Sequence, residues 1–176
     1  IFYSDSPTHI PFGPWRSVDH SQHGFFVESF IDELAVEAKQ DPYQYRRKLL
    51  SAKPRLLNVL DRVAKEADWD TPIGNHRGRG IALQESFGTV VAEVVEVSVR
   101  NGKIVVDRVV IAVDPGFAVA PDGLTAQMES GVVYGLTAAL YGEVSIENGR
   151  VKEANFDTYP MVRMADAPKI ETHIIN

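Results

Sequence analysis

Hydrophobic residues recur at helical spacing in the first half of the chain. Between residues 24 and 38, apolar side chains fall three and four positions apart, which is typical of one face of an amphipathic helix: Phe26, Phe30, Ile31, Leu34, Ala35 and Ala38. Asp41-Pro42 indicates the start of a second helix, because aspartate can cap the first turn and proline has no N–H to lose there. Pro54 begins a third predicted helix.

The second and third helices are also predicted to be amphipathic. In the second, we expect Tyr45, Leu49 and Leu50 to face inward, and Arg46, Arg47 and Lys48 to face solvent. In the third, the predicted inward stripe is Leu56, Leu60, Val63, Ala64 and Ala67.

The second half of the chain is predicted to form strands after a loop over residues 70–79. Strands are predicted over residues 80–87, 89–100 and 103–114, and Asn101-Gly102 predicts a type I′ hairpin turn that pairs Val99 with Ile104. Near the turn, polar residues share one face of the hairpin. Farther away, we expect Val109, Ile111 and Val113 to join Val90, Ala92 and Val94 on that same face, so that the base of the hairpin is covered on both sides. Glu93 falls on the apolar face, which predicts a partner or a place at a rim.

A buried strand, a turn and a long helix form the central stretch of the chain. The unbroken apolar run 109–113 predicts a strand covered on both faces, and Pro115-Gly116 ends it. The helix is predicted over residues 122–142, with Asp122 as its cap. Gly131 and Gly135 each cost such a helix about 1 kcal/mol relative to alanine. The cost is explained if another element or a ligand approaches the backbone closely there.

Together these patterns predict an α+β fold with N-terminal helices followed by a mainly antiparallel sheet packed against the long glycine-containing helix. We divide the chain into an extended and helical part, residues 1–78, and a β-rich part, residues 79–176, within one compact unit. A short hairpin at Asn148-Gly149 and a last strand over residues 169–175 complete it.

Composition narrows the functional classes. The net charge of −6 and the pI of about 5.3 argue against a general nucleic-acid or anionic-membrane binder. The absence of cysteine excludes disulfides and thiolate-bound metals or clusters within the chain. The 176 residues begin at isoleucine and end in an apolar segment, so we expect a piece of a longer polypeptide.

Few residues suggest chemistry by themselves. Nothing near His20 and His23 completes a metal site. Glu129 and Glu143 are acid–base candidates by residue type alone, which leaves a hydrolase as a weak alternative. Gln127, in the first turns of the glycine-containing helix, could pair with an anionic or heteroaromatic ligand, although an ordinary exposed glutamine is the commoner explanation.

Eight stretches, in order along nearly the whole chain, resemble the molybdenum-binding subunits of molybdenum hydroxylases. The similarity is greatest to the beta subunit of isoquinoline 1-oxidoreductase and to related aldehyde dehydrogenases of the xanthine dehydrogenase superfamily. The stretches are Gly13-Pro14-Trp15-Arg16-Ser17-Val18, residues 26–35, Asp41-Pro42, residues 80–82, Phe87-Gly88-Thr89, Ala112-Val113-Asp114-Pro115-Gly116, Gln127-Met128-Glu129-Ser130-Gly131 and residues 155–160.

The resemblance implies a bacterial enzyme, periplasmic or cytoplasmic, that binds molybdopterin cytosine dinucleotide. It implies hydroxylation of N-heteroaromatics or aldehydes with oxygen from water, and electron transfer to a small [2Fe–2S] partner. Arg16 and Gln127 match family positions near the molybdenum and the pterin, so both are predicted to bind the cofactor.

The sequence also departs from the family pattern. Pro115 stands where cysteine is common, Ser130 stands where glycine is common, and the glycine–glutamate loop that carries the family's catalytic base would follow Asn176. We therefore expect no catalytic residue and no metal ligand in this chain, no turnover and no stably bound cofactor on its own. The alternative is a non-catalytic α+β module that self-associates through exposed apolar faces.

Overall fold

The computed structural model describes residues 13–175. Three helices, α1 (His20–Glu37), α2 (Pro42–Leu49) and α3 (Pro54–Glu66), precede the strands β1 (Arg77–Ser86), β2 (Thr89–Arg100) and β3 (Lys103–Asp114). Helix α4 (Pro121–Leu140), the short strands β4 (Ile146–Glu147) and β5 (Arg150–Val151), and strand β6 (Lys169–Ile174) follow. The predicted α+β class is confirmed.

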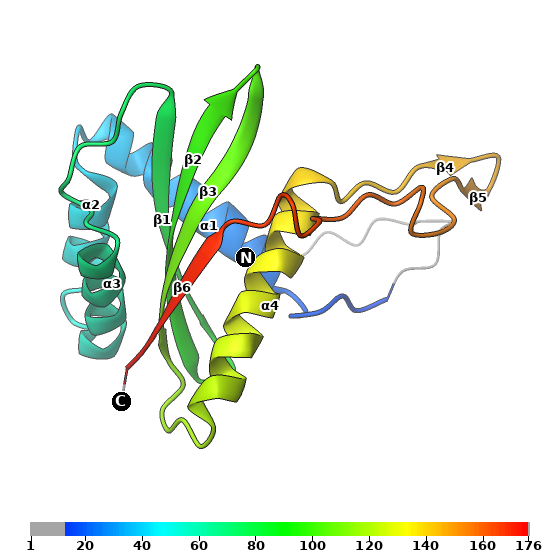
Figure 1. The fold of residues 1–176 in the computed structure, drawn as a ribbon. Helices are drawn as coiled ribbons and strands as arrows, with labels where there is room; N and C mark the ends of the chain where they lie inside the picture. The colour runs from blue at the N-terminus through cyan, green and yellow to red at the C-terminus, as the bar shows by residue number, and fades with distance from the viewer. Residues whose placement is uncertain (1–12, 176) are drawn as a thin grey trace.

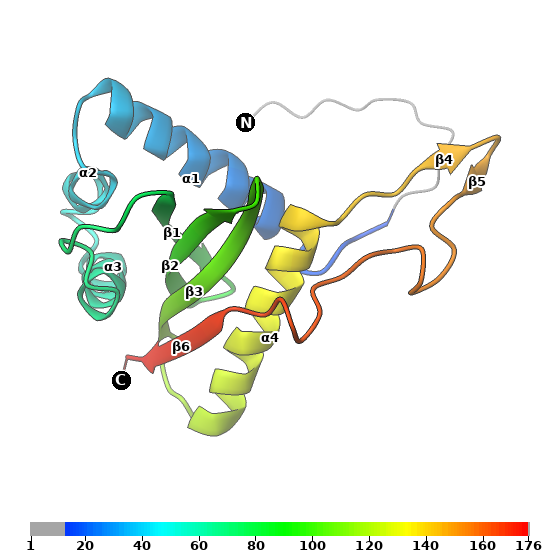
Figure 2. The ribbon, with the colours of Figure 1, turned by 45° about the horizontal axis from the view of Figure 1, so that its top comes forward.

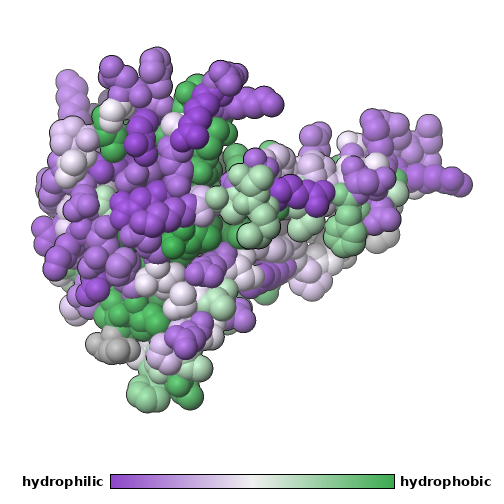
Figure 3. Space-filling view, in the orientation of Figure 1, coloured by the Kyte–Doolittle hydropathy of each residue, from purple (hydrophilic) through white to green (hydrophobic). Residues whose placement is uncertain are grey.

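The strands form a four-stranded sheet in the order β1-β2-β3-β6, in which only β3 and β6 are parallel among the described residues. Helices α2 and α3 lie on one side of this sheet and α4 on the other, whereas β4 and β5 form an arm that projects from the body (Figure 1). Figure 2 shows that the N-terminal end of α1 approaches the side of α4. In Figure 3, hydrophilic side chains gather over α2 and α3 and over the end of the arm.

Most helix boundaries agree with the sequence pattern. Asp41 accepts a hydrogen bond from the Gln44 backbone N–H and Pro42 begins α2, as predicted. Two boundaries differ. Helix α1 begins at His20 instead of residue 24, and α4 begins at Pro121 with Ala120 at its N-cap position, so the prediction of Asp122 as the cap is wrong.

The hairpin turn has the predicted geometry, with positive φ at both Asn101 and Gly102 and with Val99 opposite Ile104. A β-bulge then shifts the register, because Val97 pairs with Val106 whereas Glu96 pairs with Arg108. The extra residue is Asp107, and it moves every later residue of β3 to the opposite face of the sheet.

This bulge corrects the predicted faces of the hairpin base. Val109 and Ile111 pack in the cluster under α4, together with Val132, whereas Val110 and Ala112 pack in the cluster under α3. The run 109–113 is completely buried, which confirms that β3 is covered on both faces.

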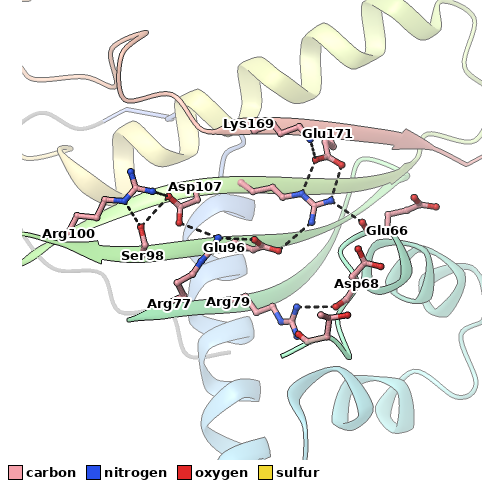
Figure 4. Close-up of polar contacts among 12 residues, drawn as sticks. Glu66, Asp68, Arg77, Arg79, Glu96, Ser98, Arg100, Asp107, Lys169 and Glu171 are labelled. Atoms are coloured by element: carbon pink, nitrogen blue, oxygen red, sulfur yellow. Dashed lines mark hydrogen bonds and ion pairs between the residues drawn. The ribbon is translucent and has the colours of Figure 1, made fainter. Parts of the chain in front are cut away.

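Polar residues cover the α3-side face of the hairpin where it is not packed. Asp107 pairs with Arg100 at 2.5 Å and with Arg77 at 3.5 Å (Figure 4). Farther along, Arg108 donates to both carboxylate oxygens of Glu171, at 2.8 and 2.9 Å. The wet face of the hairpin therefore carries a ladder of ion pairs across all four strands, which links β6 to the rest of the sheet.

The position of Arg46 contradicts the prediction that it faces solvent. Only 2% of the residue is exposed, and its guanidinium donates to the Glu28 carboxylate at 2.9 Å, to Asp32 at 2.6 Å and to the backbone carbonyls of Pro42 and Glu28. Leu49, predicted to be inward, is 55% exposed. The polar contacts of Arg46 thus set the orientation of α2.

Candidate functional site

A cavity of about 460 Å³ lies on the α4-side face of the sheet, between the N-terminal half of α1 and one side of α4. We call it the α1–α4 trough. Its floor consists of alternate residues of β1 and β2, which point to the same face of the sheet: Ala82, Gln84, Val91 and Glu93. The floor exists because α4 packs over β3 and β6 and leaves this part of β1 and β2 for α1 to flank.

Three glycines form part of the walls of the trough. Gly131 and Gly135 line it from α4, and a Cβ atom added at either would meet no atom within 4 Å. No described strand or helix therefore packs against these glycines, and the close approach of another element does not explain them. Gly24 lies on the α1 side, where an added Cβ would be 3.5 Å from the Gln84 side chain.

Glu93 is the ionisable residue on the floor. In the sheet it lies between Ala82 of β1 and Ile111 of β3, so its carboxyl has apolar neighbours on both sides. Burial raises the pKa of the Glu93 carboxyl, and within residues 13–175 no hydrogen bond or ion pair opposes that shift. Glu93 is therefore half-buried on the floor of the trough, not at a rim, and no partner in the described part of the chain holds its charge.

The α1 side of the trough is polar and well ordered by contacts. The Gln84 amide lies 3.4 Å from His20 Nδ1, and the His20 and Phe87 rings form a T-shaped pair with 5.0 Å between their centroids. Glu28 also lines the trough, but its carboxylate already accepts hydrogen bonds from Arg46 and from the Leu83 backbone N–H, both at 2.9 Å.

Gln127 and Arg16 lie along the same helix, α4, but do not share a pocket: Gln127 belongs to α4, and Arg16 packs on its Tyr134. The Arg16 guanidinium carbon lies 5.0 Å from the centre of the Tyr134 ring, which also contacts Trp15 at 5.6 Å. Tyr134 follows Gln127 by seven residues, so the two share a face of α4 at a separation of about 10 Å along its axis. Gln127 and Arg16 are both exposed, and neither lines the trough.

The other candidates do not form a site. Glu129 lies in α4 and Glu143 beyond its C-terminal end, both exposed, so roughly 16 Å of helix separates them. Among the residues that the structure describes, no group of three or more metal-ligating side chains converges. Within the same part of the chain, no helix is long and apolar enough to cross a bilayer.

Sequence reasoning missed the trough, although it noticed three of its residues. A glutamate on an apolar strand face and two glycines in one helix were separate anomalies in the sequence. Only the packing of α1 and α4 on one face of the sheet brings Glu93, Gly131 and Gly135 into the same cavity.

Taken together, an α+β domain with an exposed amide and an exposed guanidinium along one helix is a scaffold suited to binding a polar cofactor at its surface. Residues 29–168 match the molybdopterin cofactor-binding domain family, and the chain belongs to that family. The resemblance to molybdenum hydroxylases is thereby confirmed.

Two curated relatives agree with this assignment. The chain is 33% identical over 165 residues to the beta chain of isoquinoline 1-oxidoreductase from Brevundimonas diminuta, and the match covers 91% of this chain and 21% of that protein. It is 32% identical over 179 residues to a nicotinate dehydrogenase subunit of Pseudomonas putida, and this match covers 91% of the chain and 15% of that protein. The chain thus spans about a fifth or less of the length of these relatives.

A crystal structure of a Cu,Mo-CO dehydrogenase is similar over 49% of this chain and 11% of its own, at 21% identity and a TM-score of 0.44.

Proposed function

We propose that this chain is part of the molybdopterin-binding subunit of a molybdenum hydroxylase, an oxidoreductase that hydroxylates N-heteroaromatics or aldehydes with oxygen from water. The family match over residues 29–168 is the observation that carries this proposal. The two relatives named above, whose names refer to the oxidation of isoquinoline and nicotinate, support the N-heteroaromatic class of substrate.

The residues along α4 fit a molybdopterin dinucleotide. The Gln127 amide is exposed and can both donate to and accept from a pterin edge, while the exposed Arg16 guanidinium suits a negatively charged group. We propose Gln127 and Arg16 as cofactor contacts, with Tyr134 holding Arg16 in place by a cation–π contact. When bound, a molybdopterin cytosine dinucleotide would supply the two-electron chemistry of the hydroxylation.

The rest of the catalytic apparatus is proposed to lie outside the chain. The resemblance to molybdenum hydroxylases implies that the general base is a glutamate in a glycine–glutamate loop. It also implies that electrons leave through a small [2Fe–2S] partner subunit. We therefore propose that the 176 residues alone neither turn over substrate nor retain the cofactor.

The test uses the complete large subunit that contains this chain, expressed with its partner and measured for molybdenum and pterin content. Gln127→Ala and Arg16→Ala are expected to lower both contents, whereas Glu129→Ala, at an exposed neighbouring position of α4, is the matched control. Normal cofactor content in both variants would contradict the assigned contacts. A large subunit that contains no molybdenum would contradict the proposed function.

The alternative of a self-associating module is favoured by one observation. On α1, two aromatic residues of the apolar stripe face outward: Phe26 is 61% and Phe30 58% exposed, while Ala35 is the buried residue of the helix. An apolar helix face of this kind is covered in most proteins. Because the chain spans only about a fifth of its relatives, we propose that the remainder of the large subunit covers this face.

Light scattering on the 176-residue chain separates the two candidates. If the chain is a monomer at all concentrations, the result supports the proposal that it is part of a larger subunit. A concentration-dependent dimer that Phe30→Asp abolishes would support the self-associating module instead. Glu33→Asp, on the same helix and exposed, serves as the control for the substitution.

A further inference from the structure

The proposed cofactor contacts leave the α1–α4 trough unassigned. The trough is larger than an apolar cavity of about 150 Å³, which already holds benzene, and it falls within the range of about 300–1,000 Å³ typical of ligand pockets. On the α4 side its wall consists of Met128, Gly131 and Gly135, and on the α1 side Gly24 and Phe25 lie between the polar residues His20, Ser21 and Glu28. The absence of side chains at Gly24, Gly131 and Gly135 leaves room for a flat ring between the two helices.

Two polar side chains stand on the floor, but the Gln84 amide already contacts His20 and the Glu85 carbonyl, which leaves the Glu93 carboxyl to meet the ring. Glu93 stands on the floor with apolar neighbours in both adjoining strands and no partner among the described residues. A protonated carboxyl donates through its O–H and accepts at its carbonyl oxygen, which matches an edge that offers one N–H and one carbonyl or ring acceptor.

We propose that the α1–α4 trough binds a planar, uncharged ring compound with an amide-type edge, held by a pair of hydrogen bonds to the carboxylic acid of Glu93. This binding is independent of the proposed cofactor contacts, because neither Gln127 nor Arg16 lines the trough.

The surrounding charges favour a neutral ligand. On the α1 side, the Glu28 carboxylate is neutralised by Arg46, and His20 lies at the rim beside Gln84. Helix α4 contributes Met128 and glycines to the trough, and β3 places Ile111 beside Glu93, so neither element brings a charge to the floor. The raised pKa of Glu93 agrees with a carboxyl that stays protonated above the usual range of glutamate.

The test compares three probes of the same shape on the 176-residue chain, by calorimetry or by NMR titration: benzamide, benzoate and benzamidine. Benzamide is expected to bind most tightly, and its affinity should fall as the pH rises through the pKa of Glu93, because the ionised carboxylate can no longer donate. Glu93→Gln keeps one donor and one acceptor, so it is expected to bind benzamide with no such pH dependence.

Two further variants separate the carboxyl from the cavity. Glu93→Val removes both hydrogen bonds and is expected to weaken benzamide at least tenfold, which corresponds to about 1.4 kcal/mol. Gly131→Leu fills the trough from the α4 side and is expected to abolish binding. Ser130→Leu, at the adjacent exposed position outside the trough, is expected to leave it unchanged. Circular dichroism and urea unfolding identify any variant that fails to fold.

Three results would overturn the proposal. The first is no binding of benzamide to the folded chain. The second is tighter binding of benzamidine, with an affinity that rises with pH, because Glu93 would then act as an anion. The third is benzamide binding that survives both Glu93→Val and Gly131→Leu. None of these results depends on molybdenum content, so the proposed function is judged separately.

Discussion

Replacing Arg46 by methionine tests whether a single buried guanidinium joins the helices to the sheet. Arg46 of α2 donates to Glu28 and Asp32 of α1, and Glu28 in turn accepts the backbone N–H of Leu83 in β1. Methionine keeps most of the length of the side chain but none of its donors. The Glu28 carboxylate, whose side chain is 12% exposed, then loses its charged partner.

The expected loss in the free energy of unfolding is about 3–5 kcal/mol, because removing one member of a buried ion pair leaves the other charge uncompensated. A domain of this size is typically stable by about 5–15 kcal/mol, so Arg46→Met consumes a large part of the total. Urea unfolding followed by circular dichroism measures the loss, provided that the slope with urea does not change.

The adjacent residue supplies the control. Arg47 pairs with Asp61, but their side chains are 42% and 35% exposed, so Arg47→Met is expected to cost about 1 kcal/mol or less. Adding Glu28→Gln to Arg46→Met is expected to recover part of the loss, since it removes the stranded charge. If Arg46→Met and Arg47→Met are equally stable, or if Glu28→Gln brings no recovery, the buried-pair argument is refuted.

Two further changes test the sheet. Hydrogen bonds from Arg108, aided by Lys169, lower the pKa of Glu171 to about 2 from 4.5, so the stability that ionised Glu171 provides is present above about pH 4.5 and lost as the pH falls toward 2. Glu171→Gln is expected to flatten the acid side of the stability curve over that range, and an unchanged acid slope relative to Glu33→Gln, an exposed control, would count against it. Gly102 has a φ of +72° in the hairpin turn, so Gly102→Ala is expected to destabilise the fold by about 1–2 kcal/mol. Gly80→Ala is expected to leave the stability nearly unchanged, because Gly80 lies in β1 at an ordinary φ and an added Cβ meets open space. Equal thermal unfolding temperatures for the two variants would contradict the expected strain at the turn.

Local chemistry made several parts of this fold predictable. The Asp41 cap and Pro42 of α2 and the Asn101-Gly102 turn each depend on a few adjacent residues, and each lies at the predicted position. The burial of the run 109–113 was also predictable, because an unbroken apolar run ended by Pro115-Gly116 is typical of a strand that is covered on both sides.

The errors share a different cause. The apolar spacing of α1 does not show whether the element that covers this face belongs to this chain, and Phe26 and Phe30 are exposed. Arg46 was predicted to be a solvated charge because its partners lie 14 and 18 residues away, on another helix. The bulge at Asp107 leaves no composition signal, yet it fixes which face of the sheet each later residue of β3 occupies.

Local patterns were thus enough for the class of fold, the Asn101-Gly102 turn, the buried strand and, through the resemblance, the family. These depend on residues that are close in the chain or on motifs that persist in order. The folded chain was needed to show that Glu93, Gly131 and Gly135 line one cavity, and that Arg16 and Gln127 lie along one helix, α4. Their proximity depends on how helices pack across a sheet, and the packing of distant elements is not encoded in the spacing of any single segment.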